Sequence, residues 1–353
     1  MKILKNVSLY GSITDIKVEN GKICEIGKFS EGGVDFSGLK IFPGLIDVHS
    51  HAVLTYDTAD EENHLEEMAD YYLSQGTTCW YPTNGALPKE ILYKVFHRNL
   101  KFGHGADIPG FHMEGPFLSP THRGAHLEKN LALPDLQWIY DCPNIKRVTL
   151  APELPGGMEF IRKCPVQTTV GHTNATYDIA KEAFMNGATC LTHTFNAMNG
   201  IHHRAPGPIG AASDTPWVFA ELICDGYHIH PASVRMLAKI MGVDRVVLVS
   251  DTIRGAGMAD GVYESIGSMI TIKDGKALTP DGAIAGSTTT LFGCVKKAIE
   301  FGFSEEVAVK MASENPARMM GLNKGRIVCG YDADFILVDE KFNLVKSIVR
   351  GEF

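Results

Sequence analysis

The middle of the chain repeats one pattern, in which a short apolar run ends in polar residues and a helical stretch follows. The six clearest runs are residues 44–51, 108–115, 166–173, 188–195, 218–228 and 245–251. Strands that alternate with helices indicate βαβ units and parallel strands. Six such units plus weaker ones favour an α/β fold of the (β/α)8 TIM-like barrel type over an open sheet. A dinucleotide-binding sheet is disfavoured because no G-x-G-x-x-G motif follows the first run.

The two ends of the chain carry a different pattern. Asn20-Gly21 lies between two stretches of alternating apolar and polar residues, which is a strong hairpin signal. Residues 332–353 also indicate two strands around a polar turn. We therefore predict that both termini contribute to one small β-sandwich domain. The predicted domains are the β-sandwich, residues 1–42 and 326–353, and the barrel, residues 43–325.

Charge and composition exclude several classes of protein. Lys and Arg number 33 against 41 Asp and Glu, so the formal charge is −8 and a global basic field for nucleic acid is absent. No apolar run approaches the roughly 18 residues that a membrane span needs. The first residues lack the apolar core of a signal peptide, and the eight scattered cysteines form no C-x-x-C pair. We therefore expect a cytoplasmic protein with free, buried thiols and no nucleic-acid or membrane partner.

Each of the six runs ends in side chains that can bind a metal or titrate. They are His49 and His51, His112 and Glu114, His172, His193, Asp225 with His228, and Asp251. In a barrel, side chains at the carboxyl ends of the strands converge on one active site. We therefore expect this set to meet at one rim of the barrel.

Two groups of these residues are candidate metal ligands. His49 and His51 are two residues apart on a strand, so both rings face the same side and can share a metal, although a histidine pair satisfied within the core fits equally well. Glu114, His172 and His193 form a Glu/His/His set, and catalytic zinc sites typically use three protein ligands. The alternatives are an acidic residue in a first helical turn for Glu114 and core histidines for the other two.

Two further residues have a chemical and a structural interpretation. Asp251 follows four aliphatic residues, where it is either a general base beside a metal or the cap of the next helix. Arg204 lies in a loop with His202, His203, glycine and prolines. Its guanidinium would match phosphate oxygens, although an exposed loop arginine is as good an explanation from the sequence.

Together the motifs resemble one enzyme family. They are PGLIDVHSH, FHMEGPFLSP, RGAH, GHT-A, THTFNAM, HHRAPG, DGYHIHP, LVSD, AGSTTTL and, near the C-terminus, NPARMMGL and KGRIVCGYDADFILVD. This set resembles the N-acetylglucosamine-6-phosphate deacetylase family of the amidohydrolase superfamily, in the same order and over nearly the whole chain. The resemblance implies a metal-dependent hydrolase that releases acetate from a phosphorylated acetamido sugar.

The resemblance also assigns roles to residues of this chain. It implies metal ligation by Glu114, His172 and His193 and proton transfer by Asp251. The residues with an implied substrate contact are Ala125, His126, Asn196, Ala197, Arg204, Asp225, Gly226, Tyr227, His228, Ile284, Ala285 and Gly286. Zinc is the first choice of cofactor, with iron or manganese as alternatives. Because this chain keeps both His49 and His51, the resemblance allows one or two ions per subunit.

The resemblance further implies a homodimer, in which Arg204 reaches the phosphate bound by the neighbouring subunit. The chain departs from the family pattern after His51 and at Thr252-Ile253-Arg254, which replace smaller residues. Both segments are expected near the pocket, so three alternatives remain open for the activity. They are deacetylation of the galacto epimer, hydrolysis of another amide such as a cyclic amide or an acylated amino acid, and non-enzymatic sensing of a sugar phosphate.

Overall fold

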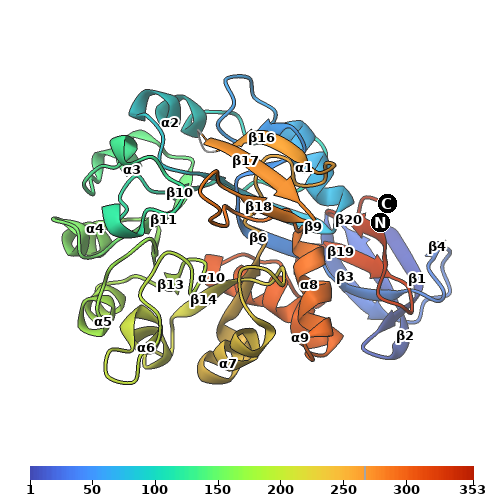
Figure 1. Cartoon of the computed structure of the whole chain (residues 1–353). Coiled ribbons are helices and arrows are strands. Elements are labelled where there is room, and N and C mark those ends of the chain that lie inside the picture. Colours follow the sequence, from blue (N-terminus) through green and yellow to red (C-terminus); the bar gives the residue numbers. More distant parts are fainter. Residues whose placement is uncertain (266–267) are drawn as a thin grey trace.

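The computed structural model describes residues 1–265 and 268–353, and its core is a parallel barrel. The barrel strands, in chain order, are β6 (Leu45–Ser50), β9 (Thr77–Asn84), β10 (Phe111–Glu114), β11 (Ile145–Leu150), β12 (Gln167–Val170), β13 (Cys190–Leu191), β14 (Phe219–Ile223) and β15 (Val246–Val249). Each strand pairs with the next in this order, and β15 also contacts β6, which closes the ring (Figure 1). The predicted (β/α)8 barrel is confirmed.

Two of the barrel strands were not among the six predicted runs. Strand β9 contains Pro82, and β11 carries Arg147 among its apolar residues, so neither stretch is typical of an interior strand in the sequence. In the structure every residue of β9 is buried, and Arg147 has no exposed surface. Burial on both faces is what a parallel strand covered by helices requires.

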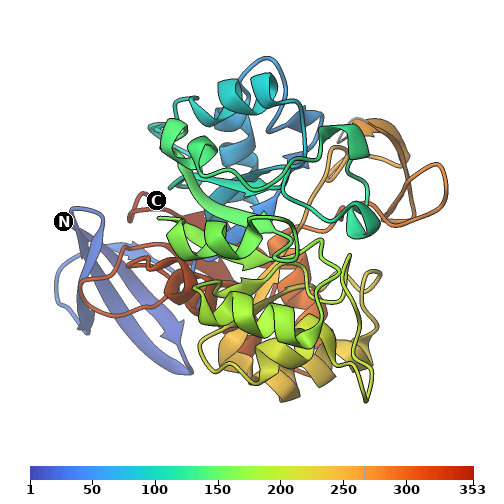
Figure 2. The same ribbon diagram turned by 90° about the vertical axis from the view of Figure 1, so that its left-hand side faces the viewer.

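Helices form the outer layer (Figures 1 and 2). They are α1 (Leu65–Ser74), α2 (Lys89–Phe96), α3 (Gln137–Asp141), α4 (Gly157–Lys163), α5 (Tyr177–Met185), α6 (Gly207–Ser213), α7 (Pro231–Met241), α8 (Leu291–Glu300), α9 (Glu305–Ala312) and α10 (Glu314–Met320), with 3-10 turns η1 (Pro120–His122), η2 (Glu128–Asn130) and η3 (Val243–Arg245). Helix α5 shows why these segments are helical. The side chain of Thr176 caps it by accepting the Ile179 N–H, and Ala180, Ala183 and Phe184 bury one face. Over residues 1–265 and 268–353, none of the helices combines the length and apolar character needed to cross a membrane.

The two termini share a separate sheet-rich domain, as expected. Its strands are β1 (Lys2–Leu9), β2 (Ser12–Glu19), β3 (Lys22–Gly27), β4 (Val34–Asp35), β5 (Lys40–Pro43), β19 (Phe335–Val338) and β20 (Leu344–Ile348). Asn20 and Gly21 form the β2–β3 turn with φ angles of 51° and 74°, the left-handed values of a tight hairpin. Lys2 pairs with Glu352, so the chain ends meet (Figure 1). The proposed domain limits at 42/43 and 325/326 stay a prediction.

A third sheet, which the sequence did not predict, follows β15. It consists of β16 (Gly261–Ser265), β17 (Ser268–Lys273) and β18 (Lys276–Leu278), and a small β7 (Ala52–Val53) and β8 (Tyr56–Asp57) hairpin follows β6. Figure 2 shows the β16–β18 sheet on the side of the barrel opposite the terminal domain. Its Ile270 and Ile272 pack against Ile253 and Ala285, which anchors the segment that returns to the barrel.

The cysteine prediction was partly wrong. All eight cysteines are free, but Cys24 and Cys329 are exposed. Both lie in the terminal domain, where a one-sheet layer leaves more positions facing solvent than a barrel wall does.

Candidate active site

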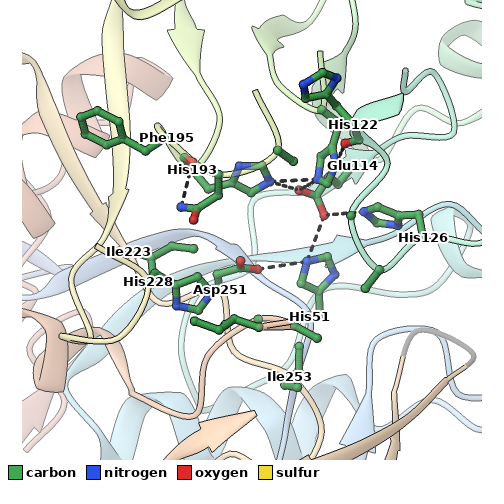
Figure 3. A pocket seen from close by; sticks show the side chains of 18 of the residues that line it. His51, Glu114, His122, His126, His193, Phe195, Ile223, His228, Asp251 and Ile253 are labelled. Carbon is green, nitrogen blue, oxygen red and sulfur yellow. Dashed lines mark hydrogen bonds and ion pairs between the residues drawn. The ribbon is translucent and has the colours of Figure 1, made fainter. Parts of the chain in front are cut away.

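A pocket of about 430 Å³ opens at the carboxyl ends of the barrel strands. The predicted site residues that line it are His51, Glu114, Ala125, His126, His172, His193, Asn196, Ala197, His228, Asp251, Ile284, Ala285 and Gly286. Figure 3 shows His51, His126, His193 and Asp251 directed towards Glu114 or towards one another. Of the strand-end residues expected at one rim, the structure brings six to this pocket, and His49, His112 and Asp225 do not line it. The six are His51, Glu114, His172, His193, His228 and Asp251.

Glu114, at the end of β10, is the centre of the cluster. Its Oε1 atom lies 3.2 Å from His172 Nε2 and 3.0 Å from His193 Nε2. The two imidazole Nε2 atoms lie 2.9 Å from each other. Three ligand atoms, from the end of β10 and from the segments that follow β12 and β13, therefore surround one small volume.

The hydrogen-bond partners of His172 show which of its ring nitrogens faces the space between the three ligand atoms and whether it can bind a cation. His172 Nδ1 lies 2.8 Å from the carbonyl oxygen of His122, which only accepts hydrogen bonds, so Nδ1 carries the hydrogen. Burial lowers the pKa of His172 to about 4, so the ring is neutral at pH 7 and its Nε2 presents a lone pair. A lone pair directed at a carboxylate oxygen is repulsive unless a cation lies between them. The donor set of Glu114, His172 and His193 therefore fits a divalent cation.

A second group of ligand atoms adjoins the first. His51 Nε2 lies 3.1 Å from Glu114 Oε2 and 3.3 Å from Asp251 Oδ1. His49 Nε2 lies 3.2 Å from Glu114 Oε1 and 3.5 Å from Asp251 Oδ1. Glu114 thus belongs to both sets, and the arrangement has room for a second ion held by His49, His51 and Glu114.

The charges of this cluster are strongly coupled. Burial would raise the pKa of Glu114, but the surrounding imidazoles, His49 foremost, hold it well below its usual range. Burial likewise opposes ionisation of Asp251, but His49 and His51 lower its pKa to about 2. Burial lowers the pKa of His51, yet hydrogen bonds to Asp251 and Glu114 outweigh it and raise that pKa to about 9. Both carboxylates are therefore ionised at neutral pH, and protons and a metal ion compete for the same lone pairs.

The backbone is strained where it presents these side chains. His172, His193 and Asp251 have φ angles of 47°, 26° and 50°, in the left-handed region that non-glycine residues seldom adopt. Such residues persist only where the surrounding structure holds them, and they cluster at functional sites. Here the Asp251 N–H donates to the His49 carbonyl oxygen at 2.9 Å, which ties β15 to β6 beside the cluster.

Two more histidines face the pocket with defined orientations. His126 Nδ1 accepts the Ala86 N–H at 3.1 Å, so its Nε2 carries the hydrogen and is directed at Glu114 Oε2, 3.5 Å away. His228 Nδ1 lies 2.7 Å from Asp225 Oδ2, and Asp225 also accepts the N–H of Tyr227 and of His228. Asp225 therefore holds the His228 ring and does not itself line the pocket.

Arg204 lies outside this pocket. It lines a separate cavity of about 700 Å³ with Tyr177, Asp178 and His202, and its Nη1 lies 2.8 Å from His203 Nε2. Gly226 and Tyr227, two other predicted substrate contacts, are likewise not among the described residues that line the first pocket. Within one subunit, the structure therefore does not bring Arg204 to the metal-ligand cluster.

The sequence analysis missed other residues of the site. Phe195 and Ile223 line the pocket with apolar surface, and so does Ile253, which was expected near the pocket but was given no role. Their signal was their position, since each lies at or just beyond the end of a barrel strand. Glu221 is buried beneath His49, and its signal was a charged residue inside the apolar run of β14.

The comparisons with known proteins agree with this geometry. The amidohydrolase family model matches residues 41–353, so the chain belongs to the amidohydrolase family. N-acetylglucosamine-6-phosphate deacetylase from Vibrio furnissii is 33% identical over 353 residues, covering 94% of this chain and 88% of that protein. Within the amidohydrolases the chain is thus a member of the N-acetylglucosamine-6-phosphate deacetylase group.

Two further similarities bear on the substrate. N-acetylgalactosamine-6-phosphate deacetylase from Escherichia coli O157:H7 is 30% identical over 353 residues, covering 96% of this chain and 93% of that protein. A solved structure of a variant of N-acetyl-D-glucosamine-6-phosphate deacetylase from Mycobacterium smegmatis, in complex with N-acetyl-D-glucosamine-6-phosphate, superposes with a TM-score of 0.92. It is 27% identical, and the match covers 99% of this chain and 98% of that one.

Proposed function

We propose that the protein is a metal-dependent hydrolase that converts N-acetylglucosamine 6-phosphate to glucosamine 6-phosphate and acetate in amino-sugar catabolism. One observation carries the proposal: Glu114, His172 and His193 converge within 3.2 Å of one another in the same pocket as Asp251. This arrangement combines a cation site with an ionised carboxylate, a combination suited to metal-assisted hydrolysis of an unactivated amide.

Glu114, His172 and His193 would hold the first divalent cation, and His49 and His51 would share Glu114 with a second. Zinc is our first choice, with iron or manganese as alternatives, because imidazole and carboxylate ligands suit all three. The cation would polarise the acetyl carbonyl and lower the pKa of water bound to it. The protein residues supply proton transfer and substrate binding.

Asp251 moves the proton. As water attacks the acetyl carbon, an Asp251 carboxylate oxygen accepts the water proton, and the new carbon–oxygen bond forms. Asp251 then donates that proton to the sugar nitrogen as the carbon–nitrogen bond breaks, which releases the amine and acetic acid; the acid then loses its proton to give acetate. Its low pKa favours the ionised form that begins the cycle.

The remaining predicted residues would bind the substrate. His126 presents an Nε2–H group beside Glu114, where it can donate to the acetyl oxygen as negative charge develops. His228, oriented by Asp225, would hold a polar group of the sugar. The other proposed contacts come from Ala125, Asn196, Ala197, Gly226, Tyr227, Ile284, Ala285 and Gly286.

Phosphate binding leads us to propose a homodimer. Arg204 does not line the pocket of its own subunit. It lies in an exposed loop with His202 and His203, so a neighbouring molecule can reach it. A two-fold dimer in which this loop enters the neighbouring pocket would place Arg204 on the substrate phosphate. A cytoplasmic location also remains part of the proposal.

A second candidate substrate is N-acetylgalactosamine 6-phosphate. The Escherichia coli O157:H7 relative named for that substrate is 30% identical over 353 residues, and the Vibrio furnissii relative is 33% identical over the same number of residues. The apolar lining from Phe195, Ile223 and Ile253 would then decide which epimer fits.

An acetate-release assay tests the proposal. The purified chain, analysed for bound metal, is assayed on both 6-phosphorylated acetamido sugars and on unphosphorylated N-acetylglucosamine. We expect acetate from a phosphorylated sugar, loss of activity on chelation and recovery with Zn²⁺. Sugar-phosphate binding without acetate release would instead support a sensor, and equal rates with and without phosphate would support another amide hydrolase.

A further inference from the structure

A buried charge pair lies beneath the pocket. Arg147 of β11 and Glu221 of β14 form an ion pair inside the barrel, and neither side chain has exposed surface. Removing two charges from water costs free energy, and apolar residues of the same volume often stabilise a core as well or better. The ion pair therefore calls for an explanation other than filling the barrel interior.

One oxygen of Glu221 contacts both groups of candidate metal ligands. Its Oε2 atom lies 3.1 Å from His49 Nδ1 and accepts the backbone N–H of His193 at 3.0 Å. The same carboxylate thus holds a ring carried by β6 and the backbone that presents a ring from the end of β13. Arg147 holds the other oxygen and donates to the Val48 carbonyl oxygen at 3.2 Å, next to His49 in the chain.

This contact determines which nitrogen of His49 faces the pocket. A carboxylate only accepts hydrogen bonds, so His49 Nδ1 must carry the hydrogen that Glu221 accepts. The lone pair of a neutral His49 ring is then on Nε2, which faces Glu114 and Asp251. Carboxylates that fix metal-binding histidines in this way raise metal affinity in many proteins.

We propose that Glu221, supported by Arg147, is a positioning residue that orients His49 and His193 together and so couples the two cation sites through a single carboxylate oxygen. The proposal rests on the metal centre of the proposed function. It adds two residues that touch neither substrate nor metal.

His112 is another buried neighbour of His49, and it supports the ring by packing rather than by a hydrogen bond. Its ring packs edge-on against the His49 ring with centroids 4.6 Å apart. Its two nitrogens face the hydroxyls of Thr83 and Thr149. His112 therefore supports the His49 ring by packing, whereas Glu221 alone supplies a hydrogen-bond acceptor to His49 Nδ1 among the described residues.

Two uncharged double variants distinguish a role of Glu221 in orienting His49 and His193 from a role in filling the barrel interior. Arg147→Met with Glu221→Gln removes both charges but keeps an acceptor oxygen that can face His49 and His193. Arg147→Met with Glu221→Leu has similar volume and no acceptor. Removing Arg147 in both avoids an unpaired buried cation, which would unfold a variant for an unrelated reason. Thr169→Val is the control for disturbing the barrel interior, since its hydroxyl contacts Cys190 and Thr192 rather than a metal ligand.

The measurement is equilibrium binding of Zn²⁺ to the metal-free proteins, with Co²⁺ absorption spectra as a second readout. We expect the Gln variant to bind Zn²⁺ within about threefold of wild type and the Leu variant to bind about 10–100-fold more weakly at one or both sites. Thr169→Val should alter only the melting temperature. Equal Zn²⁺ affinity of the Gln and Leu variants would overturn the proposal. A wild-type chain that binds no Zn²⁺ would overturn the metal centre itself, whereas one that binds Zn²⁺ without releasing acetate would overturn only the assigned reaction.

Discussion

The Nε2 atoms of His172 and His193 lie 2.9 Å apart, although the two residues follow different strands of the barrel, β12 and β13. Both are directed at Glu114 Oε1, which ends a third strand. The lone pair of the neutral His172 ring and the Glu114 carboxylate oxygen repel each other when nothing lies between them. A cation shared by the three groups would stabilise this arrangement, and the effects expected at Asp251 and Arg204 depend on it.

Replacing Asp251 by Asn should reduce turnover by about 10²–10⁴-fold, because an amide does not accept and return the proton. Metal content should not change, since Asp251 is not in the Glu114, His172 and His193 set. Steady-state kinetics and metal analysis of the same preparation measure both quantities. Asp135→Asn, an exposed position, is the matched control. Unchanged turnover in Asp251→Asn would remove this residue from the mechanism.

Replacing Arg204 by Ala should raise KM for the phosphorylated sugar by about 10–100-fold, the effect of losing a charge-assisted hydrogen bond. Activity on the unphosphorylated sugar should stay the same, and Arg204→Lys should lie between wild type and Ala. The comparison of KM for the two sugars is decisive. If both KM values rose equally, Arg204 would have no particular role towards phosphate.

Mixed dimers test whether Arg204 acts across subunits. An Asp251→Asn chain and an Arg204→Ala chain are each impaired, but a dimer of one of each would contain one site with an intact Asp251 and the partner's intact arginine. Recovery of activity on mixing, measured after dissociation and reassociation, is expected. No recovery in confirmed mixed dimers would place the phosphate contact within one subunit.

Replacing Lys324 by Met should lower the free energy of unfolding by about 3–5 kcal/mol, because it leaves the buried Asp334 carboxylate without its cationic partner. Lys324 Nζ contacts Asp107, Asp332 and Asp334 at 2.7, 3.1 and 2.6 Å, and Asp334 is buried. Lys22→Met is the control, since that exposed lysine also pairs with Asp332 and should contribute about 0–1 kcal/mol. Chemical denaturation of both variants measures the difference; a similar small effect in each would show that the Lys324 cluster is not stabilising.

Asp15 should make part of the free energy of unfolding depend on pH in the acidic range. Burial would raise its pKa, but the N–H groups of Asn6 and Phe29 and the Lys5 ammonium hold it well below the usual range. A lowered folded pKa stabilises the protein above the unfolded pKa of about 3.9, and this stabilisation is lost as the pH falls towards the folded pKa. The difference in unfolding free energy between wild type and Asp15→Asn should therefore be constant above about pH 5 and shrink by about 1.4 kcal/mol per pH unit below pH 3.9. Denaturant titrations from pH 7 to pH 3 measure it, and a constant difference across that range would contradict the assignment.

The local sequence was sufficient to predict the barrel and the side chains at its rim. Alternation of strand and helix is a local pattern, and parallel strands place their carboxyl ends together, so Glu114, His172, His193 and Asp251 were predictable as neighbours. The Asn20-Gly21 hairpin was likewise predictable, since its turn geometry depends on two adjacent residues.

Contacts across the barrel were decided only by the tertiary structure. Strands β9 and β11 were missed because burial in the closed ring, rather than their own apolar pattern, makes them interior strands. The pairing of Arg147 with Glu221 depends on how the strands are staggered around that ring, which no local pattern encodes. The sequence alone determined which chemical groups lie at or near the strand ends. The closed barrel decided which of them reach the pocket and touch, because strand order and stagger set distances between residues far apart in the chain.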